Sequence, residues 1–260
     1  MASFPFASAL VTGASSGIGE EMTRQLRAAG VPVVVVARRG DRLGALQAEL
    51  GGIDVLTADL GTRAGQDAVA ERITDPDRPI DLVVNNAGFG TSGDFVMLDP
   101  DRLAAEIELN VAALTRLSHA ALSVMIPRGR GWLLNVSSVA GFQPAPHLAV
   151  YAATKAYVTS LSESLHEEAK GSGVKVTALC PGLTKTEFQS VANSEHHVSM
   201  APGFMFTTVE EVATAGLTDV AKGRALSVPG VLYKALTSAS AVTPRRLLRL
   251  ASNMVPRRGH

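Results

Sequence analysis

The stretch Thr12-Gly13-Ala14-Ser15-Ser16-Gly17-Ile18-Gly19 decides the fold, because it joins a short apolar run to a helical pattern. The run before it, Ala9-Leu10-Val11, is typical of a buried strand. Residues 17–29 have apolar side chains at helical spacing, and Gly30 ends the pattern. A glycine-rich turn at the start of a helix lets backbone N–H groups approach a phosphate closely. The simpler interpretation is an ordinary tight βα turn, but its position favours phosphate binding.

The alternation of apolar runs and helical patterns continues along the chain. The run Val33-Val34-Val35-Val36 is typical of a parallel strand covered on both faces. Further strands are predicted over residues 53–58, 80–84, 132–136, 174–179 and 225–228, and helices over residues 41–50 (capped by Asp41), 63–73, 101–125, 150–170 and 209–221. The sequence therefore predicts one doubly wound α/β domain of the Rossmann type, with a parallel seven-stranded sheet and helices on both faces.

Bulk composition limits the class of protein. The 260 residues are 46% hydrophobic and 18% charged, as in a globular domain, and the zero formal net charge gives no global field for nucleic acid. The single cysteine, Cys180, excludes an intrachain disulfide and agrees with a reducing compartment. We see no signal peptide and no apolar stretch of the roughly 18 residues that a spanning helix needs. We therefore expect a soluble, cytoplasmic protein that binds no nucleic acid.

The end of the second predicted strand reads Ala37-Arg38-Arg39. An NAD site usually has an acidic residue here, which holds the ribose hydroxyls. Two guanidinium groups suit a 2′-phosphate instead, because they fork around its oxygens. The alternatives are a solvated basic pair, or Asp41 as the acidic residue, which we assign to the helix cap. The pattern favours NADPH over NADH.

Two later strand ends complete the candidate dinucleotide site. Asp59-Leu60 follows the third strand, and Asp59 either accepts a hydrogen bond from an adenine amino group or caps the helix after Gly61. Asn85-Asn86-Ala87-Gly88 follows the fourth strand. Its small residues leave room for the adenosine half, and its Asn side chains are expected to tie neighbouring strands together.

Tyr151 and Lys155 lie near the start of a long predicted helix, where the four-residue spacing puts both on one face. A phenol has a pKa of about 10, and a nearby ammonium lowers that pKa, so the pair suits acid–base chemistry. Ser138 ends the fifth strand, where its hydroxyl can bond a substrate oxygen that develops charge. Asn110 lies inside a predicted helix although Asn is a poor helix former, which indicates a special role. Taken singly, each has a simpler interpretation as a surface side chain.

Together these motifs resemble one family. Thr12-Gly-x-x-x-Gly17-x-Gly19, Asn85-Asn86-Ala87-Gly88, Asn110, Ser138, Tyr151-x-x-x-Lys155 and Pro181-Gly182 are similar to the motifs of the short-chain dehydrogenase/reductase superfamily, and the compact single-domain subgroup fits best. The resemblance covers about residues 7–230, and the joint occurrence in this order is far more specific than any single motif.

The resemblance implies a role for each matching residue. Tyr151 would be the acid in reduction and the base in oxidation, while Lys155 would lower its pKa and hold the nicotinamide ribose. Ser138 would polarise the carbonyl, and Asn110 would hold a water that links Lys155 to solvent. Hydride chemistry belongs to the cofactor, so no metal is needed. Pro181, Gly182 and Thr184 or Thr186 would border the nicotinamide, its carboxamide or the phosphates.

The substrate side is irregular in sequence. Residues 188–208 are expected to form a lid over the active-site mouth, and its apolar side chains favour an apolar substrate: Met200, Phe204, Met205 and Phe206. His196-His197 has no third ligand at coherent spacing, which disfavours a metal site. His147 either lines the pocket or lies in an exposed loop.

The C-terminal residues 231–260 are predicted to be a basic amphipathic extension of a dinucleotide-binding and catalytic domain at 1–230. Eight of the 24 Lys and Arg follow Asp219, and no acidic residue does. A basic amphipathic helix in this extension can lie on an anionic membrane or pack on protein, and we favour packing on protein. The tail also resembles an extension that is seen in one branch of the family. The resemblance to the family as a whole suggests a homodimer or homotetramer.

The leading hypothesis is an NADP(H)-dependent carbonyl reductase or alcohol dehydrogenase acting on a small-molecule substrate. A cofactor-binding regulatory or scaffold protein without turnover is the alternative, although such proteins usually lack the tyrosine or the lysine. An epimerase or dehydratase on the same fold would have a longer chain and a different glycine spacing.

Overall fold

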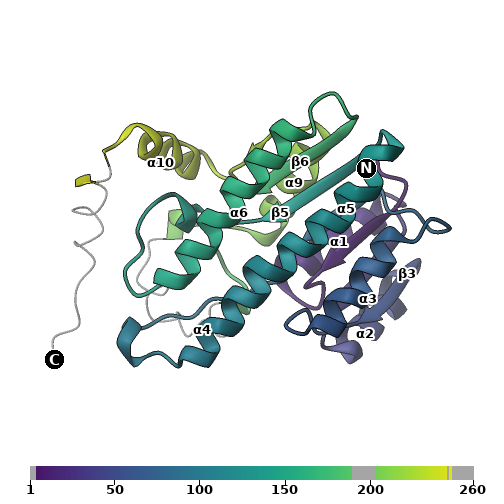
Figure 1. Cartoon of the computed structure of the whole chain (residues 1–260), viewed down its shortest axis with the longest axis horizontal. Coiled ribbons are helices and arrows are strands. Elements are labelled where there is room, and N and C mark those ends of the chain that lie inside the picture. The colour runs from purple at the N-terminus through teal and green to yellow at the C-terminus, as the bar shows by residue number, and fades with distance from the viewer. Residues whose placement is uncertain (1–3, 189–202, 245, 248–260) are drawn as a thin grey trace.

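The computed structural model describes residues 4–188, 203–244 and 246–247, and it confirms the predicted doubly wound architecture (Figure 1). Seven parallel strands form one sheet in the order β3-β2-β1-β4-β5-β6-β9. The strands are β1 (Ala9–Thr12), β2 (Val33–Ala37), β3 (Ile53–Thr57), β4 (Leu82–Asn85), β5 (Gly131–Val136), β6 (Val174–Leu179) and β9 (Leu226–Ser227). The order reverses between β1 and β4, and ligands of such sheets bind beyond the carboxyl ends of the strands at this point.

Helices cover both faces of the sheet. One apolar core includes side chains of α1 (Gly17–Ala28), α2 (Gly40–Leu50) and α9 (Val209–Ala221). The other includes side chains of α3 (Arg63–Thr74) and α5 (Leu114–Arg128), with α6 (Ala149–Glu168) packed against it. Every residue of β1 and β4 is buried, which is why continuous apolar runs rather than alternating ones marked the strands.

The helix predicted over residues 101–125 is not a regular α-helix. It consists of α4 (Pro100–Ile107), a π-helical turn at Glu108–Ala113, and α5. Asn110 lies in the π-helical turn and bonds both backbone groups of Phe89, accepting from its N–H at 3.1 Å and donating to its C=O at 2.8 Å. The unusual Asn therefore marks a widened turn, a feature that is frequent at functional sites.

The same helical stretch passes a length and composition test for crossing a membrane. Pro100–Arg128 is 29 residues long, but half of its most apolar 18-residue window is buried inside the fold. It is a core helix of this sheet, and its apolar character is no evidence for a membrane span. Our sequence-based statement that no stretch is apolar enough missed it, because charged residues interrupt the apolar run.

The predicted Asp41 cap is wrong, and of the two roles left open for Asp59 the helix cap is not formed. α2 begins at Gly40 with Arg39 at the cap position, so Asp41 is a first-turn residue rather than the cap. α3 is capped by Thr62, whose Oγ1 accepts from Gly65 N–H, and not by Asp59. Asp59 instead accepts from Gly61 N–H at 2.9 Å in the turn before the helix.

The C-terminal part has elements that the pattern did not reveal. β7 (Leu183–Thr184) pairs with β8 (Phe206–Thr207), and α10 (Val231–Val242) stands at the margin of the fold (Figure 1). Tyr233 of α10 accepts from Leu183 N–H at 3.0 Å and donates to the Met205 carbonyl at 2.7 Å. The chain after residue 230 is thus joined to the rest of the domain. The predicted basic amphipathic extension, residues 231–260, lies partly outside the described residues.

The start of α9 generates a stability prediction. Thr208 Oγ1 accepts from Glu211 N–H, and the Glu211 carboxylate accepts from Thr208 N–H, which forms a capping box. Thr208→Ala should lower the free energy of unfolding by about 1 kcal/mol, measured by urea denaturation. Thr214→Ala, on the exposed side of the same helix, is the control. Equal losses in both variants would contradict a role for the cap.

Candidate active site

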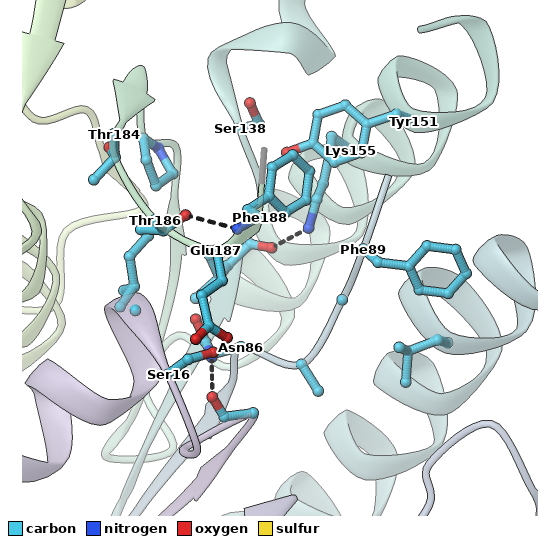
Figure 2. Close-up of a pocket in the computed structure, with 18 of the residues that line it drawn as sticks. Ser16, Asn86, Phe89, Ser138, Tyr151, Lys155, Thr184, Thr186, Glu187 and Phe188 are labelled. Atoms are coloured by element: carbon cyan, nitrogen blue, oxygen red, sulfur yellow. Dashed lines mark hydrogen bonds between the residues drawn. The ribbon is translucent and has the colours of Figure 1, made fainter. Parts of the chain in front are cut away.

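The predicted site residues converge on one cavity of about 600 Å³ at the carboxyl ends of the strands (Figure 2). All the predicted cofactor residues except Gly19 line it, together with three of the four residues that we expect to catalyse: Gly13, Ser15, Ser16, Gly17, Ile18, Arg38, Arg39, Asp59, Leu60, Asn86, Ala87, Gly88, Pro181, Gly182, Thr184, Thr186, Ser138, Tyr151 and Lys155. Gly19 and Asn110 do not line the cavity themselves, but they contact Asn86 and Phe89, which do. The sequence motifs, distant along the chain, are therefore parts of one site.

The glycine turn forms a close-packed floor at one end of the cavity. Gly13 and Gly17 have φ angles of +67° and +59°, which favour glycine. A Cβ at Gly13 or at Gly19 would lie 2.8 or 2.5 Å from the Asn86 side-chain nitrogen. Asn86 uses that nitrogen to donate to the carbonyls of Thr12 and Gly13 at 2.9 and 3.3 Å. The turn can thus pack against Asn86 only while these positions lack side chains.

Arg39 and Arg38 differ in their surroundings. The Arg39 guanidinium donates to the hydroxyls of Ser15 and Ser16, both at 2.9 Å, and pairs with Glu187 at 2.9 Å. Glu187 also pairs with Arg42 at 2.6 Å. Arg38 is exposed at the cavity rim. Sequence reasoning missed Glu187, because its partners are about 150 positions earlier in the chain.

The Glu187 carboxylate lies where a bound anion would meet Arg39. The two guanidinium groups lower the pKa of Glu187 to about 2, so this carboxyl is charged at neutral pH. The acid is half exposed, and water screens the pairs. Arg39 is therefore already aimed at an anionic oxygen at the end of β2.

Tyr151, Lys155 and Ser138 face the other end of the cavity (Figure 2). Lys155 is 5% exposed, and its Nζ donates to the Val136 carbonyl at 2.8 Å. The Nζ lies 5.7 Å from the centre of the Tyr151 ring. Ser138 Oγ accepts from Ala140 N–H at 3.1 Å, which orients the hydroxyl at the end of β5. The predicted triad is brought together, although the lysine bonds a carbonyl of β5 rather than the phenol.

Burial controls the ionisation of this pair. It raises the pKa of Tyr151 to about 12, although the neighbouring Ser138 hydroxyl opposes the rise, and it lowers the pKa of Lys155 to about 8. The lowering of the phenol pKa that we expected from the ammonium does not contribute here, and desolvation is the largest cause of the shift. At neutral pH the phenol is protonated and is an acid.

The reacting end is walled by aromatic and apolar side chains. Phe188 packs on Tyr151 with ring centres 5.2 Å apart, and Phe89 also lines the cavity, although its ring stands away from Tyr151 in Figure 2. Val139, Ala145 and Leu148 also line the cavity. His147 is not part of the lining: it has a φ of +65° and pairs with Asp94 at 2.9 Å. Residues 189–202, including His196 and His197, lie outside the described residues.

Pro181 and Gly182, in the segment after β6, line one wall of the cavity. Cys180, just before it, is buried, and burial raises the pKa of its thiol to about 12, so it is a packing residue. Thr184 and Thr186 line the cavity, and a Cβ at Gly17 would lie 3.3 Å from Thr186. In the part of the chain that the structure describes, no three His, Cys, Asp or Glu side chains could share a metal ion.

This fold and site define a class, the nucleotide-binding doubly wound domains with a Ser, Tyr and Lys at the strand ends. The family model described as short chain dehydrogenase matches residues 7–197. An "Uncharacterized oxidoreductase" of Myxococcus xanthus is 38% identical over 198 residues, which cover 74% of this chain and 78% of that protein. The chain belongs to the short-chain dehydrogenase family of oxidoreductases.

Solved structures agree over nearly the whole chain. A short-chain dehydrogenase from Sphingobium yanoikuyae in complex with NADPH has a TM-score of 0.81 and 32% identity, with 97% of each chain covered. The bulky-bulky ketone specific alcohol dehydrogenase from Comamonas testosteroni has a TM-score of 0.77 and 29% identity, with 98% of this chain and 96% of that chain covered. The architecture is therefore shared well beyond the matched motifs.

The wall of the cavity at Gly182 generates a prediction about packing. A Cβ at Gly182 would lie 2.0 Å from the Tyr233 ring, which is 5% exposed and held by two hydrogen bonds. Gly182→Ala should therefore destabilise the protein by roughly 1–3 kcal/mol, measured as the shift of the urea midpoint. Gly44→Ala is the control, because nothing lies within 4 Å of its Cβ position in α2. An unchanged urea midpoint for Gly182→Ala would contradict the close packing of the Tyr233 ring on Gly182.

Proposed function

We propose that the protein is an NADP(H)-dependent oxidoreductase that interconverts a carbonyl and an alcohol. The observation that carries the proposal is one continuous cavity with Arg39 at one end and Ser138, Tyr151 and Lys155 at the other. The family supports the reaction class, and the NADPH complex of the Sphingobium relative supports the choice of cofactor.

The residues of the cavity fit a dinucleotide. The glycine turn has no Cβ atoms where a pyrophosphate would approach, and Ser16 at the start of α1 makes no side-chain cap bond. At the end of β2 the cavity is lined by Arg38 and Arg39, which suit the additional phosphate of NADPH. Gly88, Pro181 and Gly182 would border the nicotinamide half, which supplies the hydride chemistry when it is bound.

The side chains of the protein would manage the proton and the substrate oxygen. In reduction the Tyr151 hydroxyl donates its proton to the carbonyl oxygen, and the Ser138 hydroxyl donates a hydrogen bond to the same oxygen. Lys155 carries a proton close to neutral pH, since its pKa is about 8, and it can restore the phenol after transfer. In oxidation the same groups act in reverse.

We further propose an apolar carbonyl or alcohol as substrate. Phe89, Leu148 and Phe188 bring apolar surface to the cavity, and the Phe188 ring packs at a tilt against the Tyr151 ring. The Comamonas relative is specific for bulky ketones, which agrees with this class of substrate. A cytoplasmic homo-oligomer remains our prediction on family grounds.

Tyr151→Phe tests the reaction class. Removal of the hydroxyl should lower NADPH-dependent carbonyl reduction by at least about 10²-fold, because the acid is lost, while NADPH binding followed by fluorescence is retained. Tyr157→Phe is the matched control, since Tyr157 lies on α6 with 41% exposure. Turnover that survives in Tyr151→Phe would contradict the assignment and favour the cofactor-binding protein without turnover.

A double variant tests the choice of cofactor. Arg38→Ala with Arg39→Ala should weaken NADPH binding by about 10- to 100-fold and leave NADH binding nearly unchanged, because only NADPH loses charge-assisted hydrogen bonds. Arg42→Ala is the control, since it also pairs with Glu187 but does not line the cavity. Equal losses for NADPH and NADH, measured by titration calorimetry, would refute the 2′-phosphate site.

A further inference from the structure

Glu187 is an anion that the chain itself places in the candidate cofactor site. Its side chain lines the cavity and points toward the glycine turn at Ser16 (Figure 2). One carboxylate oxygen accepts from Arg39 Nη1 at 2.9 Å, and the other accepts from Arg42 Nη1 at 2.6 Å. The two guanidinium groups hold the pKa of Glu187 at about 2, so the carboxylate is charged at neutral pH. The proposed reaction gives this acid no role.

The guanidinium group of Arg39 is divided between the glycine turn and Glu187. Its Nε and Nη2 donate to the Ser15 hydroxyl at 3.1 and 2.9 Å, and Nη2 also donates to the Ser16 hydroxyl at 2.9 Å. Nη1 donates to Glu187. A carboxylate and a phosphate both present anionic oxygens that suit arginine. Glu187 therefore accepts from the same guanidinium group that we assign to the 2′-phosphate of NADPH.

The ion pair between Arg39 and Glu187 is weak enough to exchange. The two side chains are 41% and 45% exposed, and exposed ion pairs contribute little because water and salt screen them. A phosphate monoester carries more than one negative charge at neutral pH and offers three oxygens, so it can compete with a carboxylate for arginine. Arg42, which also pairs with Glu187, does not line the cavity. Release from Arg39 would therefore leave the carboxylate a second cation.

We propose that Glu187 is a specificity-determining residue: its carboxylate competes with the 2′-phosphate of NADPH for Arg39 and thereby limits the preference for NADPH over NADH. This inference rests on the proposed function, because it needs the 2′-phosphate at Arg39. NADH has no 2′-phosphate and leaves the pair between Glu187 and Arg39 in place. NADPH has to displace that pair, so part of the attraction between its phosphate and Arg39 is offset.

Glu187→Gln tests the competition, because it removes the charge and keeps the shape. NADPH binding should tighten by about 2- to 5-fold at low salt, since Arg39 loses a competing anion, whereas NADH binding should stay unchanged. Titration calorimetry measures both affinities, and the gain for NADPH should shrink at about 0.5 M salt. Glu49→Gln is the matched control, since its carboxylate also pairs with an arginine, Arg24, is 55% exposed and does not line the cavity.

Two shorter ligands separate this effect from the other end of the cavity. The next residue, Phe188, packs on the Tyr151 ring at 5.2 Å, so a change at Glu187 can reach the reacting end. Adenosine 2′,5′-bisphosphate and adenosine 5′-phosphate carry no nicotinamide, and Glu187→Gln should tighten the binding of the first alone. Equal tightening of these two ligands, or of NADPH and NADH, would overturn the inference, since the competition acts on the 2′-phosphate.

The arginine variants separate failure of this inference from failure of the proposed function. If Arg38→Ala with Arg39→Ala weakens NADPH binding selectively but Glu187→Gln leaves NADPH binding unchanged, the cofactor site stands and the inference falls. If the arginine variant weakens NADPH and NADH binding equally, the 2′-phosphate site itself falls, and the inference falls with it. An equal gain from Glu187→Gln in an Arg39→Ala background would also overturn the inference, because the carboxylate would then act without Arg39.

Discussion

The site depends on the contact between the end of β4 and the glycine turn after β1. Thr12 Oγ1 accepts from the N–H groups of Asn86 and Ala87 at 2.9 and 3.0 Å, and Asn86 returns a bond to the Thr12 carbonyl. These bonds span the point where the strand order reverses, and they exist because Gly13 and Gly19 have no Cβ to block Asn86. Pairing of β1 with β4 joins the two halves of the sheet, and this contact holds the turn after β1 to the end of β4 at the edge of the cavity.

A buried polar network joins β4, β5 and α6 at the end of the cavity that contains Ser138, Tyr151 and Lys155. Asn85 donates to Asn135 at 2.9 Å across β4 and β5, and Asn135 donates to Ser162 of α6 at 3.0 Å. Ser137 donates to the Lys155 carbonyl at 2.7 Å, which fixes the helix that carries the lysine to the strand before Ser138. Asn85 Oδ1 has no hydrogen-bond partner among the described residues, but the remaining bonds favour one arrangement of strand and helix. Ser138 and Tyr151 meet because these bonds fix the distance between β5 and α6.

The sequence could predict what short-range patterns encode. Continuous apolar runs and glycine turns predicted the parallel sheet, and the spacing of Tyr151 and Lys155 placed both on one helix face. Residues that act across long distances in the chain could not be predicted: Glu187 finds Arg39, and Tyr233 finds Leu183, only in the folded chain. The π-helical turn at Asn110 was visible only as an unfavourable residue in a helix. The ionisation of Tyr151 was misjudged, because burial cannot be measured from spacing.

The segment after β7 shows how closely the two ends of the cavity are coupled. Glu187 pairs with Arg39 at the end of β2, while the next residue, Phe188, packs on the Tyr151 ring at 5.2 Å. Neighbouring residues thus contact the candidate phosphate site and the candidate acid. Because the ion pairs are half exposed, each is weak by itself, and the apolar contact of Phe188 does not depend on salt. The contact of Glu187 with Arg39 and the contact of Phe188 with Tyr151 therefore come from one short piece of backbone.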